Sequence, residues 1–309
     1  MENNIILSIC IPTFNRDKCI KEQLERLSSL DDEILSNIEI IISDNCSQDN
    51  SKMIIESFIS KFKFVYIRNE ENIGGDRNFL QCYSKSTGQY VLLLGDDDFI
   101  IKDAIPRLLE NLRQEEYGLI HISSSIKRNG LSSKTYIDSE HFLSDIGIWI
   151  SFMSSNIINR KFIQNIDLTK YIDTYFLQIP IYVYSAEKSK KNLMIYYRLF
   201  EDSVMYQTNG GYNIFKVFVS NYIDIFQTLL NEGIISKKLF RNEILISSDS
   251  IIPHVFNFLI KRKKSNYDTK GAIKILNKYY GLVPFIFYVV RYIIKHTISK
   301  LCHISRNIF

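Results

Sequence analysis

The chain has 309 residues, of which 46% are hydrophobic and 23% are charged, and its formal net charge is +4 at pH 7. This is the composition of an ordinary globular protein, and it excludes a fibrous, low-complexity or disordered chain. The five Cys residues show no CxxC spacing, which argues against a disulfide framework or a zinc site and favours a reducing cytoplasm. The opening stretch MENNIILSIC has no basic segment before its apolar residues, so we expect no signal peptide.

Strand and helix patterns alternate over the first hundred residues. The segments IILSICIP, IEIIISD, KFVYIRN and YVLLLGDDD are apolar runs typical of buried strands, and we expect the first to end at Pro12. Helical spacing of apolar residues lies between them, in DKCIKEQLERLSSL, NSKMIIESFISKF and GGDRNFLQCYSKS. Strands separated by helices indicate βαβ units, so we expect an α/β fold with a Rossmann-like, mostly parallel sheet and flanking helices.

The pattern is less regular after residue 104. AIPRLLENLRQ predicts a helix, YGLIHISSSI a strand, and KSKKNLMIYYRLF contains a further strand. Residues 212–260 have apolar residues at helical spacings of three and four. We therefore expect an α/β domain over residues 1–210 and a helical extension over residues 211–309.

Each of the first four predicted strands ends in polar residues. These ends are Thr13 to Arg16, Ser43 to Asn45, Asn69 to Asn78, and Asp96 to Asp98. In parallel α/β sheets ligands bind beyond the carboxyl ends of the strands, so these segments should meet at one edge. Three adjacent aspartates suit a solvated loop or helix N-terminus, but they also suit a hard divalent cation with oxygen ligands. Their convergence with the other strand ends favours a functional cluster.

Charge is distributed unevenly along the chain. Residues 261–309 hold eleven Lys or Arg and one acid, a balance of +10, which leaves 27 basic and 33 acidic residues before them, a balance of −6. The apolar core of the tail, residues 282–294, is too short to span a bilayer, which takes about 20 residues. A basic, aromatic helix of this kind suits the headgroup region of an anionic membrane, and the alternative is a helix packed on the domain.

Four motifs in this order resemble those of the family 2 glycosyltransferases, which have the GT-A fold. They are LSICIPTFNR, IEIIISDNCSQDNS, NEENIGGDRNF and YVLLLGDDDFI, and the third differs from the family in the spacing before its Arg. The resemblance covers residues 5–105 well and 105–210 loosely. Within the family the chain is most similar to bacterial enzymes that build O-antigen, capsule or related surface glycans. The resemblance implies a nucleotide-sugar half over 1–105 and an acceptor half over 106–210.

The resemblance also implies site residues and cofactors. It implies Mg²⁺ or Mn²⁺ bridging the diphosphate of a UDP-sugar donor, with Asp98 as the metal ligand and Asp96 as its support. Asp97 would contact the ribose, and Asp44 would accept a hydrogen bond from the base. The remaining donor-binding residues would be Pro12, Thr13, Phe14, Asn15, Arg16, Gly74 and Arg77. For three of the implied donor-site residues a structural role stays open. It is a turn for Asp44, the core for Phe14, and a surface ion pair for Arg77.

The catalytic base is the point where the sequence departs from the family pattern. An inverting transferase needs a carboxylate that deprotonates the acceptor hydroxyl, and the family carries it in a Glu-Asp pair at a helix start. Asp173 lies where the order of motifs predicts it but lacks the preceding Glu. Glu201 and Asp202 form the pair but lie late in the chain. We favour Asp173, with Asp202 and Glu201 as alternatives.

The resemblance finally implies partners and location. We expect a lipid-linked, polyprenyl diphosphate glycan as acceptor, no nucleic-acid partner, and a cytoplasmic enzyme on the inner face of the plasma membrane. The processive synthases of the family carry Q-x-x-R-W, which is not found here, so we expect one sugar per acceptor. Two other protein classes are alternatives: an inactive relative serving as a membrane-bound scaffold, and a haloacid-type phosphatase.

Overall fold

A computed structural model of the chain describes residues 5–123, 132–164, 166–202 and 211–306, with side chains described up to Ile294 and not for Asp202. The chain forms two compact units, Met1–Gln207 and Thr208–Phe309.

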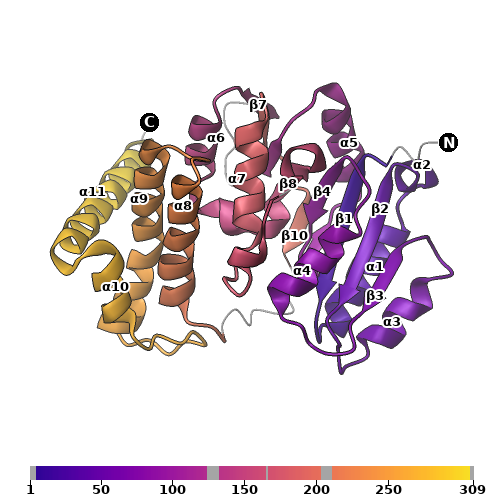
Figure 1. Cartoon of the computed structure of the whole chain (residues 1–309), viewed down its shortest axis with the longest axis horizontal. Helices are drawn as coiled ribbons and strands as arrows, with labels where there is room; N and C mark the ends of the chain where they lie inside the picture. The colour runs from indigo at the N-terminus through magenta and orange to yellow at the C-terminus, as the bar shows by residue number, and fades with distance from the viewer. Residues whose placement is uncertain (1–4, 124–131, 165, 203–210, 307–309) are drawn as a thin grey trace. The chain divides into compact units, whose positions relative to one another are not determined.

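The first unit is built on an eight-stranded sheet with the order β3-β2-β1-β4-β8-β6-β9-β7 (Figure 1). Strands β3, β2, β1 and β4 run parallel to one another, and β6 is parallel to β9. Strand β8 is antiparallel to β4 and β6, and β7 is antiparallel to β9. The mostly parallel α/β sheet predicted from the sequence is therefore confirmed. The strands are β1 Leu7–Thr13, β2 Ile38–Asp44, β3 Val65–Arg68, β4 Tyr90–Leu93, β6 Leu119–Ile122, β7 Ser133–Tyr136, β8 Asn156–Asn159 and β9 Asn192–Ile195.

Strands β1 and β2 each lie between two other strands of the sheet, and they carry apolar residues on both faces because both faces are covered. The prediction that Pro12 ends β1 is wrong by one residue, since the strand continues to Thr13. Pairing with β4 stops at Cys10, so Pro12 is bonded to β2 alone. A proline without an N–H is tolerated where one side of the strand needs no ladder bond.

Helices of the first unit pack against this sheet and supply the other half of its core. In α5 the residues Ile105, Leu108 and Leu112 are buried on one face, in the spacing of an amphipathic helix. Residues from α1, α3 and α5 join those of β1, β2 and β4 in one hydrophobic cluster. The helices are α1 Asp17–Ser28, α2 Asp32–Leu35, α3 Ser51–Phe58, α4 Gly75–Ser84, α5 Ala104–Gln114, α6 Ser139–Ile146 and α7 Gln178–Lys188.

A second, two-stranded sheet follows the aspartate triplet. Strand β5 (Asp98–Ile100) pairs antiparallel with β10 (Phe200–Asp202), and the backbone of Asp202 lies opposite that of Asp98. The segment after the triplet is thus held in extended form by a part of the chain about one hundred residues later. This pairing fixes the direction in which the chain leaves the edge of the main sheet.

The second unit is helical, as the sequence predicts for the C-terminal region. Its helices α8 Tyr222–Asn231, α9 Lys237–His254, α10 Ala272–Tyr280 and α11 Leu282–Arg306 are accompanied by two π-helical segments, Lys216–Asn221 and Val255–Ile260. Buried residues from α9, α10 and α11, including Ile251, Leu276 and Phe285, form its hydrophobic core.

Among the described residues, one helical stretch, Lys237–Ile260, is long and apolar enough to cross a membrane, and 28% of its most apolar window is buried. Helices α10 and α11 pass the same test together, with a bend of 90° between them. The core helix of a soluble protein meets this test as well.

Candidate active site

A cavity of about 620 Å³ opens at the carboxyl ends of β1 and β4. It brings together eight of the residues predicted from the sequence, drawn from positions 12 to 173. They are Pro12, Thr13, Phe14, Arg16, Gly74, Asp96, Asp97 and Asp173. The strand-end segments therefore do meet at one edge of the sheet, as expected for ligand sites in parallel α/β folds.

Asp96 is the most deeply buried carboxyl of this cavity, with 6% of its surface exposed. The Thr13 hydroxyl donates to its Oδ2 at 2.7 Å, and Arg16 Nη1 lies 3.3 Å from its Oδ1. Burial raises the pKa of Asp96 to about 7, although the positive charge of Arg16 opposes that rise. The same Arg16 nitrogen also forms an ion pair with Asp97. The two carboxylates and one guanidinium make a compact charged floor.

Asp98 has a different environment from its two neighbours. The Ser154 hydroxyl donates to its Oδ2, and its main chain belongs to β5. The residues that line the cavity in the described part of the chain include Asp96 and Asp97 but not Asp98. The triplet is thus divided, with two carboxylates at the cavity and the third held against Ser154.

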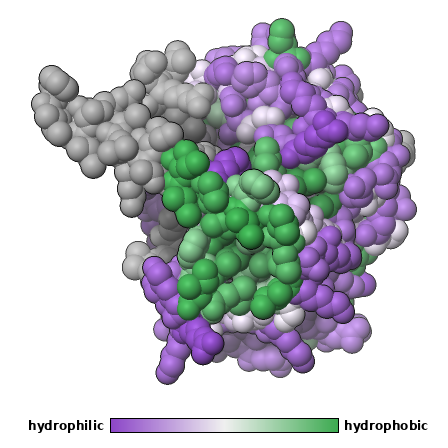
Figure 2. All heavy atoms as spheres, turned by 90° about the vertical axis from the view of Figure 1, so that its left-hand side faces the viewer, coloured by the Kyte–Doolittle hydropathy of each residue, from purple (hydrophilic) through white to green (hydrophobic). Residues whose placement is uncertain are grey.

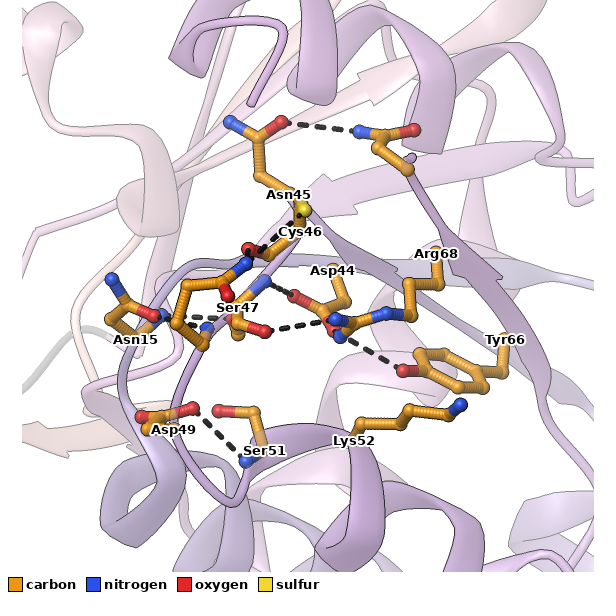
Figure 3. A network of polar contacts seen from close by, with 12 residues as sticks. Asn15, Asp44, Asn45, Cys46, Ser47, Asp49, Ser51, Lys52, Tyr66 and Arg68 are labelled. Atoms are coloured by element: carbon orange, nitrogen blue, oxygen red, sulfur yellow. Dashed lines mark hydrogen bonds and ion pairs between the residues drawn. The ribbon is translucent and has the colours of Figure 1, made fainter. Parts of the chain in front are cut away.

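Asp44, at the end of β2, is fully buried and is not among the described residues that line the cavity. Figure 3 shows the polar contacts around it. Its Oδ1 accepts the N–H of Ser47 at 2.8 Å, and its Oδ2 accepts the hydroxyl of Tyr66 at 3.2 Å and pairs with Arg68. Arg68 also donates to the Ser47 carbonyl at 2.9 Å. Asp44 therefore closes the loop after β2, which is the turn role left open above, and its neighbour Asn45 lines the cavity instead.

Asn15 ties two strand-end loops together. It has φ of +52°, its N–H donates to Ser47 Oγ at 2.9 Å, and its side-chain oxygen accepts the N–H of Gln48 at 2.7 Å. Asn tolerates the left-handed region better than most residues. Asn15 is not among the described residues that line the cavity, so its contacts are those of a loop support.

Arg77 and Asp173, predicted for separate roles, pair with each other. Arg77 Nη1 donates to Asp173 Oδ1 at 2.8 Å, and Nη2 donates to Oδ2 at 3.3 Å. The side chain of Asp173 is 71% exposed, and it lines the cavity. An exposed pair of this kind contributes about 0–1 kcal/mol, so a stronger anion competes readily for Arg77.

The alternative bases lie elsewhere. The carboxylate of Glu201 is 3.2 Å from Arg26 Nη1 on α1, and Glu201 does not line the cavity. The side chain of Asp202 lies outside the described residues. Of the two alternatives, the one that is described is directed at a helix rather than at the cavity.

Several cavity residues were not assigned a role from the sequence. Asn45, Asp76, Met153, Tyr175 and Gln178 all line it. Asn45 and Asp76 are each next to a predicted residue, which is a signal that was available. Met153, Tyr175 and Gln178 come from the acceptor half, where the motifs are weak, and long-range packing brings them to the cavity.

The described residues contain no group of three or more His, Cys, Asp or Glu side chains arranged to hold a metal ion. Mg²⁺ in phosphate-transfer sites is often held by one or two carboxylates together with substrate phosphates and waters. Asp96 and Asp97 supply two adjacent carboxylates at the cavity, which is enough for such a site.

Comparisons with known proteins agree with this geometry. The family model described as Glycosyl transferase family 2 matches residues 8–178. The abequosyltransferase RfbV of Salmonella typhimurium is 37% identical over 103 residues, which are 33% of this chain and 31% of that protein. The GalNAc(5)-diNAcBac-PP-undecaprenol beta-1,3-glucosyltransferase of Campylobacter jejuni is 25% identical over 252 residues, covering 75% of this chain and 76% of its own length.

Among solved structures, Staphylococcus aureus TarS 1-349 in complex with UDP-GlcNAc superimposes with a TM-score of 0.62. The match covers 89% of this chain and 81% of that one at 15% identity. At this identity the likeness shows the fold alone, and that fold is GT-A.

Proposed function

The chain belongs to glycosyl transferase family 2, and from this premise we propose that it moves a sugar from a UDP-sugar to a hydroxyl of a lipid-linked surface glycan. The name of the Campylobacter relative describes a glucosyltransferase whose acceptor is a glycan on PP-undecaprenol. The name of the Salmonella relative describes the transfer of a single kind of sugar. The Campylobacter name supports a lipid-linked acceptor, and the lack of Q-x-x-R-W in the sequence supports one sugar added per acceptor.

The observation that carries the donor site is the buried Asp96 beside Asp97 and Arg16. Burial raises the pKa of Asp96 to about 7, and a divalent cation bound beside it would favour its ionised form. Mg²⁺ or Mn²⁺ would fit there, with Asp96 and Asp97 as protein ligands. Asp98 is bonded to Ser154 and would reach the metal only after its side chain turns. When bound, the metal neutralises the charge that develops on the leaving diphosphate.

The protein groups around the donor have separable tasks. Thr13 holds Asp96, and the loops after β1 and β2 form the wall for the nucleotide, with Phe14 40% exposed beside it. Arg77 is not among the described lining residues but pairs with Asp173, which is, and it would exchange this weak bond for the diphosphate. Asp44 would support the base of the bound nucleotide indirectly, through the loop that it closes.

Asp173 is proposed as the base. Its carboxylate lines the same cavity as the donor floor, and once Arg77 turns to the phosphates it is available to accept the proton of an acceptor hydroxyl. Attack on the anomeric carbon opposite the leaving diphosphate inverts its configuration. The reaction is then a single in-line displacement, with the proton on Asp173 and the electron pair on the nucleotide.

The test is a panel of nucleotide-sugars, each with Mn²⁺ and with EDTA, scored by release of free nucleotide. We expect at least one UDP-sugar to release nucleotide with Mn²⁺ and not with EDTA. We expect this release to be lost in Asp96→Asn. Asp31→Asn is the control, since its carboxylate is 72% exposed and pairs with Lys102 away from the cavity. Full activity in EDTA contradicts the metal proposal, and UDP binding without release from any sugar favours the inactive scaffold.

Membrane association is the second part of this proposal, and it rests on one face of α11. Figure 2 shows an apolar patch on the second unit. On α11 seven large apolar side chains between 48% and 71% exposed recur at helical spacing. They are Leu282, Val283, Ile286, Phe287, Val290, Ile293 and Ile294. Exposed basic residues lie in the same unit at Lys261 to Lys264, Lys274 and Lys278. An apolar stripe with basic neighbours suits an anionic bilayer surface.

The opposite face of α11 is structural. Phe285 is buried in the core of the unit, and Arg291 pairs with Asp249 of α9. One face of α11 is thus packed on the unit, and the membrane proposal concerns the exposed stripe alone. Removing the tail would also remove core residues, so a point substitution is the better test.

We expect Phe287→Asp to weaken co-sedimentation with vesicles that contain anionic lipid, because it places a charge in the exposed stripe. Ile137→Asp is the matched control, since Ile137 is 84% exposed in the first unit. Equal sedimentation of both variants, or no sedimentation of the natural chain at low salt, contradicts a membrane role for this face.

A further inference from the structure

The turn at residues 173–175 carries unusual backbone strain. Asp173 has φ of +65° and Tyr175 has φ of +66°. The left-handed region is uncommon for any residue but glycine, and it is an outlier for a bulky side chain such as Tyr. Residues in such conformations cost of order 1–3 kcal/mol each, and they persist where their surroundings hold them.

Asp76, in the first turn of α4, holds the 173–175 turn because its side chain accepts hydrogen bonds from the main chain of that turn. Its Oδ2 accepts the N–H of Tyr175 at 3.2 Å. The N–H groups of Thr174 and Asp173 also stabilise the Asp76 carboxylate and lower its pKa, while burial raises it and prevails. Three successive N–H groups thus converge on one carboxylate, an arrangement that fixes the left-handed residues on either side of Thr174.

Arg77, the next residue of α4, holds the same turn by a side chain. Its guanidinium pairs with the Asp173 carboxylate. This pair is exposed and weak, whereas Asp76 is itself half-buried and contacts the main chain of the turn. If Arg77 leaves for a phosphate, Asp76 still keeps the 173–175 turn in place.

Tyr175 is directed at the cavity, not at the core. It lines the cavity together with Asp173, and it is 59% exposed. An exposed aromatic ring at the mouth of a sugar-transferring cavity offers a flat apolar face, and pyranose rings stack their C–H faces on such rings. Tyr175 follows Asp173 by two residues in the same left-handed turn, and both line the cavity.

We propose that the 173–175 turn is the acceptor subsite, with Tyr175 as the platform for the terminal sugar ring of the acceptor and Asp76 as the positioning residue of the turn. The inference rests on the proposed function, since it presumes a glycan acceptor and Asp173 as its base. Stacking on Tyr175 orients the ring so that one hydroxyl meets Asp173. Asp76 contacts no substrate and acts only by holding the turn.

The first test uses Tyr175→Gly and Tyr175→Phe. Glycine adopts φ of +66° without strain, so the Gly variant keeps the fold and loses only the ring. The probes are octyl hexosides and octyl N-acetylhexosaminides as acceptors, with the UDP-sugar that gives the fastest nucleotide release. We expect KM for the acceptor to rise about tenfold or more in Tyr175→Gly and to stay within twofold in Tyr175→Phe, with KM for the donor unchanged in both.

The second test uses Asp76→Ala and Asp76→Asn. We expect Asp76→Ala to lower kcat for transfer about tenfold or more while UDP binding, measured by calorimetry, stays within twofold. Asp76→Asn keeps one acceptor oxygen and should recover part of the rate. A merely structural residue would lower UDP binding and transfer together, with no recovery in Asp76→Asn.

The outcomes separate this inference from the function beneath it. An active natural enzyme whose Tyr175→Gly variant keeps its acceptor KM overturns the platform. A rise in donor KM instead assigns Tyr175 to the donor and also overturns it. Absence of nucleotide release from every UDP-sugar, with every octyl glycoside, overturns the proposed function and this inference with it.

Discussion

Glu243 of α9 carries a carboxyl group buried in the helical unit, and replacing it should change how stability depends on pH. Only 2% of its surface is exposed, and the hydroxyl of Tyr222 donates to its Oε2 at 2.6 Å. Burial raises the pKa of Glu243 from 4.5 to about 8, a rise that the Tyr222 hydrogen bond opposes. The perturbation is Glu243→Gln, which keeps the shape and removes the ionisation.

The sign follows from proton binding. Between pH 4.5 and pH 8 the unfolded chain has released the Glu243 proton and the folded unit has kept it. The free energy of unfolding therefore falls as pH rises through this range, by about 1.4 kcal/mol per pH unit. The raised pKa spans 3.5 units, so the full change is about 5 kcal/mol. Gln cannot ionise and lacks this fall, but its amide N–H groups need new acceptors, at a cost of about 1–3 kcal/mol.

Urea unfolding followed by circular dichroism at 222 nm, at pH 5.5 and at pH 8.5, measures this difference. We expect the Gln variant to be more stable than the natural chain at pH 8.5, and we expect this advantage to be smaller by about 3 kcal/mol at pH 5.5. Trp149 is the single Trp and lies in the first unit, so its fluorescence follows that unit separately. Glu232→Gln, an exposed carboxylate of the same unit, is the control. An equal stability difference at both pH values would refute the reasoning.

Three further substitutions test the first unit. Asp173→Asn should lower transfer by about 10²–10⁴-fold with UDP binding intact, because Asn tolerates the left-handed backbone but cannot take a proton; loss of transfer in Glu201→Gln instead would move the base there. Asp44→Asn should lower the free energy of unfolding of this unit by about 1–3 kcal/mol, because it leaves Arg68 beside a neutral amide, and Trp149 fluorescence in urea measures that loss. Gly118→Ala should lower it by more than about 3 kcal/mol or prevent folding, since a Cβ there would lie 2.1 Å from the Ser185 carbonyl oxygen; a stable Ala variant would show that this close approach relaxes.

The donor half of the molecule was predictable because its signals are local. Strands β1 and β2 are apolar runs with polar ends, and a parallel sheet places those ends at one edge. Thr13 and Asp96 could therefore be assigned to one site although 83 residues separate them, and the structure joins them by a hydrogen bond. The family resemblance rests on the same strand ends.

Side-chain direction was harder to predict than position. The sequence places Asp96, Asp97 and Asp98 together, but β5 begins at Asp98 and pairs with β10. With this pairing the carboxylate of Asp98 accepts a hydrogen bond from Ser154, and no local pattern in the sequence predicts β10. The prediction of Asp98 as metal ligand depended on that direction, and for this reason our proposal uses Asp96 and Asp97 as the protein ligands.

Helix α7 shows why the acceptor half gave weak signals. Its residues QIPIYVYSA are buried on nearly every side, so the apolar spacing that marks an amphipathic helix is absent. β-Branched and aromatic residues favour a strand there, and Pro180 is tolerated because it lies in the first turn. Long-range packing overrides the local preference, and with α7 come Gln178 and the preceding 173–175 turn.

The two walls of the cavity therefore have different origins, and this bears on specificity. The proposed donor wall is made from strand ends whose residue types suit the binding of a nucleotide diphosphate. The acceptor wall is made from the 173–175 turn, Met153 and Gln178, which reach the cavity by tertiary packing. Asp76 joins the walls, since α4 begins beside the donor site and its first turn holds the 173–175 turn. Changes of acceptor can then arise by substitution at Tyr175 without disturbing the donor floor of Asp96 and Arg16, provided that Asp76 keeps its contacts with the main chain.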